Sequence, residues 1–392
     1  MKRVVIASAV RTAIGSFNGS LSPIPATRLG SIVIGEALRR IHLNGREVNE
    51  AIMGNVLSAG LGQAPARQAG LGAGLPETVG CTTINKVCGS GLKAVILAAQ
   101  AITCGEAQVI VAGGMESMSN APYLLTRARA GYRMGHGELI DSMLKDGLWD
   151  VYNDFHMGEA AEICADNLRI SREEQDQFAL TSYQRALKAQ ENGEFKREIV
   201  PVTVDKKITA EEIVTDDEEP KRVPWEKLPT LKPSFKEGGT ITAGNASSIS
   251  DGAAALVVMT EEKAKAVGLR PLAIISGFAS FATKPEWFTT APTEAISLLL
   301  RKTGRRVSDI DLFEINEAFA VCSIAINREL GLDPERVNVR GGAVALGHPI
   351  GASGARILTT LVHALEDRKL HCGVVSLCIG GGEALAMLVE RV

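Results

Sequence analysis

The sequence predicts an α/β protein made of two similar halves, with a loop-rich segment inserted into the first. Short β-branched runs alternate with longer apolar segments at helical spacing. The pattern of residues 4–114 returns over residues 272–382. At 392 residues the chain is also longer than one hydrophobic core usually supports. Each half is therefore expected to be a sheet covered by helices.

The first half opens with a strand and a helix. Residues 4–10 are apolar but too few for a secretory signal, and Arg11 follows at once, so we interpret them as the first buried strand. Residues 27–40 place apolar side chains at helical spacing. Residues 60–70 predict a loop and a short helix, and their glycines do not form a dinucleotide-binding motif.

A cysteine stands in the middle of this half. Cys88 precedes two close glycines, and the apolar run up to residue 102 predicts a buried helix that starts at Gly89 or Ser90. The positive end of a helix lowers the pKa of a thiol, which would make Cys88 a nucleophile. The alternative is a small buried side chain in a glycine turn, because free cysteines are often core residues.

The character of the chain changes after the first half. Residues 119–248 carry more charge and proline, which predicts an inserted loop subdomain. Within it, Ser171 and Glu174 form a capping box for a helix over residues 172–190. The acidic residues 216–219 are expected to lie in a solvated loop. The predicted boundaries are 1–118 for the first half, completed by about 249–269, then 119–248 for the insert and 270–392 for the second half.

The second half repeats the first in pattern rather than in identity. Each half has an opening strand, a helix, a glycine-opened apolar helix and a β-branched run bounded by glycine, which is typical of a buried parallel strand. The matched segments are 4–10 with 272–279, 27–40 with 293–302, 88–97 with 351–362, and 109–114 with 374–382.

Three residues of the second half stand at turns that suit catalysis. His348 lies between a glycine and a proline, so a rigid turn would present it as a general base, although a histidine is often only structural. Cys378 ends a buried strand and runs into three glycines, whose N–H groups suit an oxyanion hole. Asn316 precedes a helix expected from Glu317. Its amide either caps that helix or positions a water or carbonyl oxygen.

Composition excludes several classes of function. Aromatic residues are only 4% of the chain and the net charge is −3, so the sequence shows no footprint for nucleic acid. The seven cysteines form no C-x-x-C pair, which indicates reduced thiols rather than disulfides or a zinc site. No apolar run is expected to span a membrane, and the C-terminal residues form no peroxisomal or prenylation motif, so the predicted location is the cytoplasm.

Four motifs taken together resemble the thiolase family. They are the Cys88 turn, Asn-Glu-Ala-Phe at 316–319, Gly-His-Pro with Gly-Ala-Ser-Gly at 347–354, and Cys-Ile-Gly-Gly-Gly at 378–382. The resemblance covers essentially the whole chain and is greatest to the short-chain members, the acetyl-CoA acetyltransferases. It implies the thiolase fold, in which two duplicated βαβ halves form a layered α/β/α/β/α core with an inserted loop subdomain.

The resemblance implies a role for each turn residue. Cys88 would take the acyl group as a thioester, and His348 would deprotonate Cys88 or the incoming CoA thiol. Cys378 would be the second acid/base, acting on the α-proton of acetyl-CoA. Asn316 would hold a water that, with His348, stabilises the enolate oxygen. The N–H groups of Cys88 and Gly380 would form the other oxyanion hole.

The reaction implied is the reversible Claisen condensation of two acetyl-CoA to acetoacetyl-CoA and CoA. The alternatives are a broader 3-ketoacyl-CoA thiolase of fatty-acid breakdown and a non-catalytic acyl-CoA-binding protein. CoA would be substrate and product, with no resident cofactor and no metal. The resemblance also implies a homotetramer (a dimer of dimers) with contacts near residues 119–133.

The same resemblance assigns the residues around the substrate. Trp287 and Phe288 stand where the family commonly has glycines. With Met157 they suggest a small acyl pocket, and the alternative is a shifted loop with an altered acyl preference. The expected CoA and acyl contacts are Ser247, His156, Met157, Leu148, Leu231, Phe235, Ala243, Ala318, Phe319 and Phe288. Lys221 or Arg222 would meet the 3′-phosphate, unless they form only a solvated pair balancing the acidic loop. Glu383 is an unusual charge for its place, and a nearby arginine would be its partner.

Overall fold

The computed structural model describes residues 2–204, 212–223 and 225–392, and one mixed sheet organises them. β2 (Gly15–Ser16) and β10 (Ile199–Val200) attach beside β13 and β1. The other strands lie in the order β15 (Leu312–Ile315), β16 (Cys372–Ile379), β17 (Glu383–Arg391), β14 (Ala273–Ala282), β1 (Val4–Thr12), β13 (Ser250–Thr260), β5 (Val109–Ser117), β3 (Glu50–Gly54) and β4 (Gly80–Ile84).

The sheet contains the same strand pattern twice. The order β15-β16-β17-β14 reproduces β3-β5-β13-β1, and in each copy the first pair is parallel and the next two pairs are antiparallel. A register irregularity even recurs at the same place, next to Ile6 in β1 and next to Ile275 in β14. The predicted duplication is confirmed. The prediction of a parallel strand at residues 109–114 holds only on the β3 side, since β5 runs antiparallel to β13.

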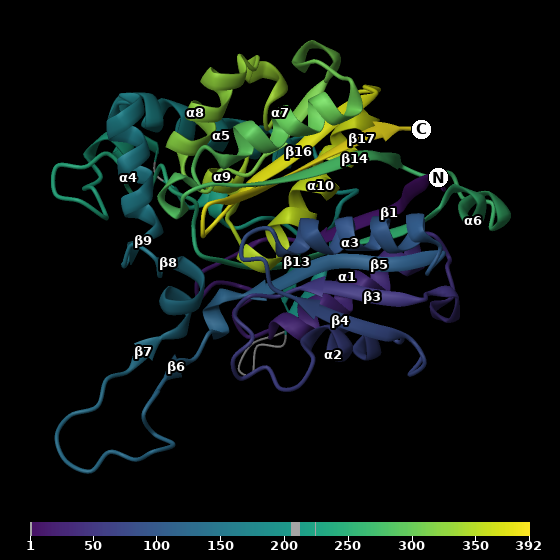
Figure 1. Cartoon of the computed structure of the whole chain (residues 1–392), viewed down its shortest axis with the longest axis horizontal. Coiled ribbons are helices and arrows are strands. Elements are labelled where there is room, and N and C mark those ends of the chain that lie inside the picture. The colour runs from purple at the N-terminus through teal and green to yellow at the C-terminus, as the bar shows by residue number, and fades with distance from the viewer. Residues whose placement is uncertain (1, 205–211, 224) are drawn as a thin grey trace.

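Helices form three layers around the two copies of the pattern (Figure 1). Apolar clusters fill the space between each helical layer and its sheet, as expected for covered sheets. The outer layers are α1 (Ala26–Arg40) with α2 (Pro65–Gly72) on one side and α7 (Ala291–Thr303) with α8 (Ala320–Leu330) on the other, and the middle layer is α3 (Ser90–Cys104) with α10 (Ile350–Asp367). Two shorter helices are α6 (Glu261–Ala266) and α9 (Ala343–Leu346).

The two middle helices touch backbone to backbone near their first turns. A Cβ added to Gly91 would lie 2.7 Å from the Ala355 nitrogen, and one added to Gly354 would lie 2.4 Å from the Leu92 nitrogen. Only glycine permits such an approach. The close contact brings together the turns that carry Cys88 and His348.

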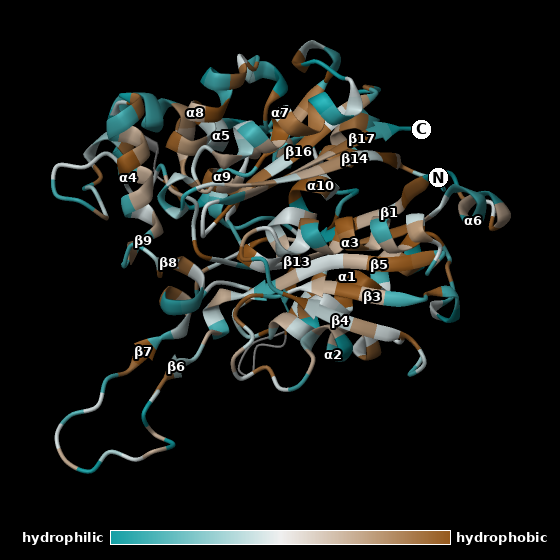
Figure 2. Ribbon diagram, viewed as in Figure 1, coloured by the Kyte–Doolittle hydropathy of each residue, from teal (hydrophilic) through white to brown (hydrophobic). Residues whose placement is uncertain are grey.

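One stretch of the middle layer has the length and hydropathy of a membrane span, contrary to the sequence expectation. The window Val87–Cys104 has a mean hydropathy of 1.5 and includes α3. In the structure its helix packs between the two copies of the strand pattern (Figure 2). Leu92, Val95 and Ile102 on this helix are fully buried. Its hydropathy is accounted for by core packing.

The insert holds more regular structure than a loop subdomain. The capping box at Ser171 is confirmed: the Glu174 nitrogen donates to Ser171 Oγ at 3.2 Å, and the Ser171 nitrogen donates to the Glu174 carboxylate at 2.9 Å. The helix before it was not expected. The elements of the insert are α4 (Met157–Leu168), α5 (Arg172–Glu191) and the strand pairs β6 (Tyr123–Leu124) with β7 (Ile140–Asp141), β8 (Trp149–Asp150) with β9 (Phe155–His156), and β11 (Val202–Val204) with β12 (Glu212–Val214).

The acidic segment of the insert is anchored on the first strand. Asp217 is fully buried, accepts from both terminal nitrogens of Arg11 at 2.7 and 2.9 Å, and accepts from the Ile14 nitrogen at 2.8 Å. A buried carboxylate is costly unless it is paired and hydrogen-bonded, and Arg11 supplies both. The expectation of a solvated loop is therefore wrong at Asp217.

Candidate active site

Four turns meet where the middle helices begin. The Cys88 turn leads into α3, and the His348 turn leads into α10. Asn316 directly follows β15, and Gly380 directly follows β16. Asn316 Nδ2 lies 3.5 Å from His348 Nε2, and Gly380 packs against Val87, where an added Cβ would lie 3.6 Å from Val87 Cγ1. Cys378 lies two residues before Gly380 and close enough to Cys88 to raise the pKa of its thiol, so the fold brings together all five residues expected to carry the chemistry.

Cys88 sits at the end of a tight, strained turn. The helix begins at Ser90, as predicted, and the Lys86 nitrogen donates to Ser90 Oγ at 2.8 Å. Val87 has a φ of +44°, a conformation that β-branched residues rarely adopt. Such strain persists only where the surroundings hold it, and it is common beside reactive residues.

The electrostatics of Cys88 differ from the sequence expectation. Burial raises the pKa of the thiol to about 12, and the neighbouring Cys378 and Glu116 add to the increase. The N–H groups of Gly380 and of Cys88 itself lower the pKa, but by less than burial and the two neighbours raise it. The prediction of a lowered pKa is therefore wrong. The thiol is neutral at pH 7 and needs a base when it attacks.

His348 has the protonation state that a base needs. Ser353 Oγ lies 2.6 Å from His348 Nδ1 and donates to the Pro349 carbonyl at 2.9 Å, so the hydroxyl accepts from a protonated Nδ1. Burial lowers the pKa of His348 to about 3, and the positive charge of Arg356 contributes. The imidazole is therefore neutral, with an unprotonated Nε2. Ser353 was not singled out by the sequence, although it lies within the motif that follows His348.

Asn316 faces the site rather than capping a helix. The helix after it begins at Ala320 with Phe319 as its N-cap, so the expected start at Glu317 is wrong by three residues. The backbone nitrogen of Asn316 donates to the Ser376 carbonyl at 3.0 Å, which fixes the turn. Asn316 Oδ1 is buried without a partner among the described residues. A buried amide oxygen of this kind is a place for a water molecule.

Cys378 lies in an apolar wall beside these groups. It is 1% exposed and belongs to a buried cluster with Met157, Phe288 and Phe319. Cys322 belongs to the same buried cluster. Trp287, expected beside Phe288, is only half-buried and lies outside this cluster.

The expected CoA contacts separate into two groups. A cavity of about 460 Å³ opens onto His348 and contains six of them: Leu148, His156, Phe235, Ala243, Ser247 and Phe319. In it, the ring of His156 stacks on Phe235 with centroids 4.6 Å apart. Leu231 and Ala318 do not line this cavity, although the Ala318 carbonyl accepts from the Ser247 nitrogen at 3.0 Å. Met157 and Phe288 lie behind it in the Cys378 wall.

The two basic candidates for the CoA phosphate are paired with acids. Lys221 Nζ lies 2.8 Å from an Asp216 oxygen, and Arg222 lies 3.9 Å from Glu218. Neither basic residue lines the cavity that opens onto His348, whereas Glu219, which lies between Glu218 and Lys221 in the chain, does line it. The alternative of a solvated pair that balances the acidic segment describes this arrangement better.

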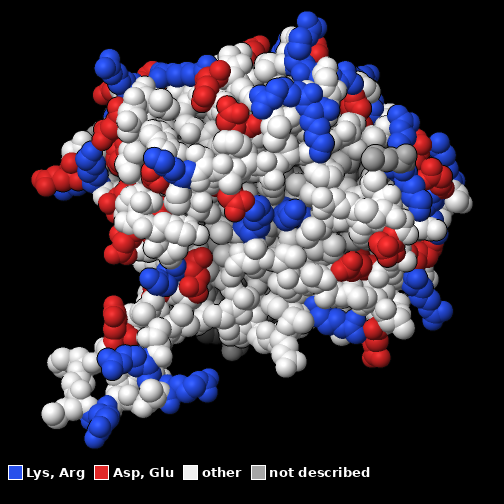
Figure 3. Space-filling view, in the orientation of Figure 1, with Lys and Arg blue, Asp and Glu red and all other residues white. Residues whose placement is uncertain are grey.

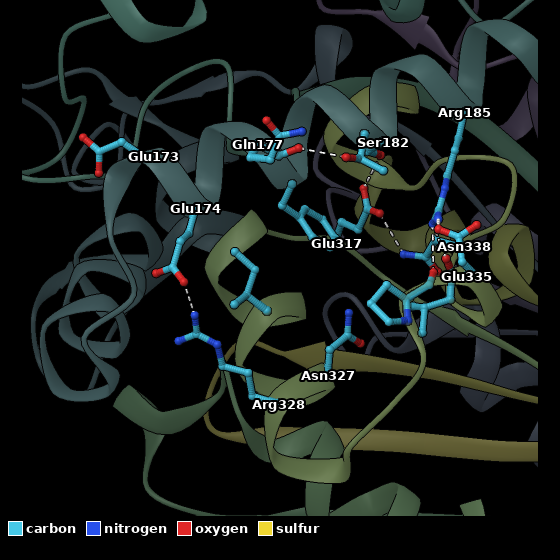
Figure 4. A pocket seen from close by; sticks show the side chains of 15 residues that line it. Glu173, Glu174, Gln177, Ser182, Arg185, Glu317, Asn327, Arg328, Glu335 and Asn338 are labelled. Atoms are coloured by element: carbon cyan, nitrogen blue, oxygen red, sulfur yellow. Dashed lines mark hydrogen bonds and ion pairs between the residues drawn. The ribbon is translucent and has the colours of Figure 1, made fainter. Parts of the chain in front are cut away.

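A larger cavity, of about 710 Å³, lies outside the catalytic turns, between α5 and α8 (Figure 4). Glu317 forms part of its wall and points toward Ser182 and Asn338, which donate to its carboxylate at 2.7 and 2.8 Å. The Val344 nitrogen donates to it as well. These hydrogen bonds fix Glu317. Because Glu317 directly follows Asn316 in the chain, they also limit the movement of the Asn316 amide.

Glu116 is a second positioning residue that sequence patterns did not single out. At the end of β5 its carboxylate accepts from Asn55 Nδ2 at 2.8 Å, the Val56 nitrogen at 3.0 Å and the Gly351 nitrogen at 2.9 Å. It therefore ties the turn after β3 to the start of α10. Burial raises the pKa of Glu116 to about 7.

The raised pKa of Cys88 predicts a particular pH profile for its alkylation. In the free enzyme only the thiolate reacts with iodoacetamide, so the rate at Cys88 should rise about tenfold per pH unit from pH 6 to pH 9. Neutral His348 should add no step in this range. Peptide mapping after timed alkylation measures the rate. A plateau near pH 7 would reveal a standing thiolate and contradict this description of the site.

Comparison with known proteins identifies the family. Residues 4–262 match the family described as thiolase, N-terminal domain, and residues 269–391 match thiolase, C-terminal domain. A Staphylococcus aureus (strain MRSA252) protein named probable acetyl-CoA acyltransferase is 52% identical over 392 residues, covering all of both chains.

Solved structures agree with this match. The Bacillus anthracis acetyl-CoA acetyltransferase has a TM-score of 0.98 at 44% identity, covering 100% of this chain and 99% of that one. A thiolase from Ascaris suum in complex with coenzyme A has a TM-score of 0.94 at 46% identity, with full coverage of both chains. The chain therefore belongs to the thiolase family and is an acyltransferase with the thiolase fold.

Proposed function

We propose that this thiolase interconverts two acetyl-CoA with acetoacetyl-CoA and CoA through an acetyl group carried on Cys88. The observation that carries the proposal is the convergence of four groups beside one cavity. The neutral imidazole of His348 lines the cavity and lies 3.5 Å from the Asn316 amide, and the neutral thiol of Cys88 is close enough to Cys378 for that second thiol to raise its pKa. Claisen chemistry needs these parts: a covalent nucleophile, a base and donors for the enolate oxygen. The name of the Bacillus anthracis neighbour supports the choice of the acetyl group.

The first half-reaction loads the enzyme. His348 Nε2 takes the proton of Cys88 as the sulfur attacks the carbonyl carbon of acetyl-CoA. The N–H groups of Cys88 and Gly380 stabilise the oxyanion. A bond from the carbonyl carbon to Cys88 Sγ forms, the bond to the CoA sulfur breaks, and His348 returns the proton to the departing CoA thiolate.

The second half-reaction makes the carbon–carbon bond. Cys378 removes an α-proton from a second acetyl-CoA, while His348 and a water on Asn316 stabilise the enolate oxygen. The enolate carbon attacks the carbonyl carbon of the acetyl group on Cys88 as the bond from that carbon to Cys88 Sγ breaks. The departing sulfur takes up the proton that Cys378 removed, which leaves Cys378 ready to act as a base again. Thiolysis is the same sequence in reverse, with CoA as a substrate rather than a resident cofactor.

The apolar wall favours a short acyl group. Phe288 and Met157 pack against Cys378, so bulky side chains occupy space that a long chain would need. The alternative is a broader 3-ketoacyl-CoA thiolase of fatty-acid breakdown, which would use the same catalytic residues.

Thiolysis rates separate these two functions. We expect kcat/KM for acetoacetyl-CoA to exceed that for 3-ketohexadecanoyl-CoA by at least about tenfold, since extra methylenes would clash with the wall. Release of acetyl-CoA at equal enzyme and CoA concentrations measures both rates. Faster turnover of the long substrate would replace the proposal with the broader thiolase.

We also propose a cytoplasmic homotetramer. The segment between β6 and β7 extends away from the body of the molecule and carries Arg127, Arg129 and Arg133 in a basic cluster (Figure 3). Leu125 and Met134 on the same segment are 49% and 97% exposed. An exposed arm with apolar side chains suits contact with another copy of the chain. Light scattering of the purified protein tests the assembly, and cell fractionation tests the location.

A further inference from the structure

An ion pair connects the two catalytic turns that flank the oxyanion hole. Lys86 Nζ meets a carboxylate oxygen of Glu383. Lys86 lies two residues before Cys88, and Glu383 lies three residues after Gly380. The partner of Glu383 is therefore a lysine of the nucleophile turn, not the arginine that the sequence suggested.

The two turns also pack directly against each other. A Cβ on Gly380 would lie 3.6 Å from Val87 Cγ1, and a Cβ on Gly89 would lie 2.5 Å from Ile379 Cδ1. Because the turns are in contact, a shift of one changes the position of the Cys88 sulfur relative to the Gly380 N–H group. The Lys86–Glu383 pair sits at the edge of this contact.

The two ends of the pair differ in rigidity. Glu383 opens β17 and is paired in the sheet with both Ile379 and Ala282, so its backbone is fixed on both sides. Lys86 belongs to the strained turn, where Val87 holds its φ of +44°. Glu383 therefore has a fixed backbone position, and its ion pair with Lys86 helps to hold the strained turn in place.

Both side chains are free to serve this contact. Their exposed fractions are 25% for Lys86 and 38% for Glu383, and among the described residues neither has another ion-pair partner.

We propose that the Lys86–Glu383 ion pair is a positioning clamp: it holds the Cys88 turn against the Gly380 turn and so sets the oxyanion-hole geometry for acyl transfer. This inference rests on the proposed role of Cys88 as the acylated residue. Neither side chain touches the reacting atoms, so the clamp acts on the rate of acylation through the positions of the Cys88 sulfur and the Gly380 N–H group.

The expected effect is modest. A partly exposed ion pair contributes little on its own, while displacement of an oxyanion donor is costly to the transition state. We therefore expect Lys86→Met and Glu383→Met each to slow acetylation about two- to fivefold, which is the effect of losing part of this alignment.

Rapid-quench mixing with acetyl-CoA followed by intact-protein mass spectrometry measures the acetylation rate. Lys86→Arg should keep the wild-type rate, and the charge exchange Lys86→Glu with Glu383→Lys should restore it to within about twofold. High salt should slow the wild type but not Lys86→Met, since salt screens the pair. A structural role alone would not produce this salt dependence.

The chain offers a matched control pair. Lys263 and Glu47 form an ion pair of 2.6 Å with similar exposed fractions, 23% and 35%, on α6 and the turn before β3. Lys263→Met and Glu47→Met should leave the acetylation rate unchanged. Wild-type rates in both Lys86→Met and Glu383→Met, or slow acetylation in Lys86→Arg, would overturn the clamp. Absence of an acetyl adduct on the wild type would instead overturn the proposed function.

Discussion

Replacing Cys88 with alanine is expected to abolish the acetyl adduct and to lower thiolysis of acetoacetyl-CoA by at least about 10⁴-fold. The acetyl group must wait on the enzyme while the first CoA leaves, and no other thiol occupies the start of α3 in the described chain. Initial rates in both reaction directions, together with intact mass, measure the effect.

The control for this variant lies on the same helix. Cys104 is exposed at the other end of α3, so Cys104→Ala removes a thiol without touching the site. It should keep the wild-type rate in both directions and the wild-type acetyl adduct. Substantial activity in Cys88→Ala would assign the nucleophile elsewhere.

Replacing Cys378 with serine is expected to separate the two half-reactions. Cys88 and His348 remain in place, so acetylation should proceed within about threefold of the wild-type rate. Condensation should fall by about 10²–10⁴-fold, because a serine hydroxyl is a far poorer acid/base than a thiol. Acetyl-adduct formation and acetoacetyl-CoA production are measured on the same preparation.

Cys322 provides the matched control for that variant. It belongs to the same buried cluster as Cys378, yet the mechanism gives it no proton to carry. Cys322→Ala should therefore condense acetyl-CoA at a rate close to that of the wild type. Normal condensation by Cys378→Ser would remove Cys378 from its role as the second acid/base.

The turns that carry the chemistry were predictable from sequence because their signals are local. Glycines beside Cys88 and Cys378 and the proline after His348 mark sharp turns, and the apolar runs behind them mark buried helices. The duplication was visible for the same reason, since each half repeats the same run of periodicities.

What sequence could not supply depends on distant contacts. The pKa of Cys88 is set by burial and by Cys378, which reaches it only through the fold. Asp217 is buried because Arg11 pairs with it across 206 positions, and Lys86 meets Glu383 across 297. No local pattern reports such partners.

Helix boundaries failed where tertiary structure overrides local signals. The helix after Asn316 starts three residues later than expected, because the Glu317 side chain turns inward to Ser182 and Asn338. Because the helix starts later, the Asn316 amide faces His348 instead of capping the helix. The deviation from the simple strand–helix junction is thus part of the site.

The most direct test of the account is to mix the wild-type protein with acetyl-CoA, quench in acid and locate the modification by peptide mapping. We expect one acetyl group per chain, on the peptide that contains Cys88, and its removal when CoA is added back before the quench. An unmodified protein, or an acetyl group confined to another residue, would contradict the assignment of Cys88 as the acyl carrier.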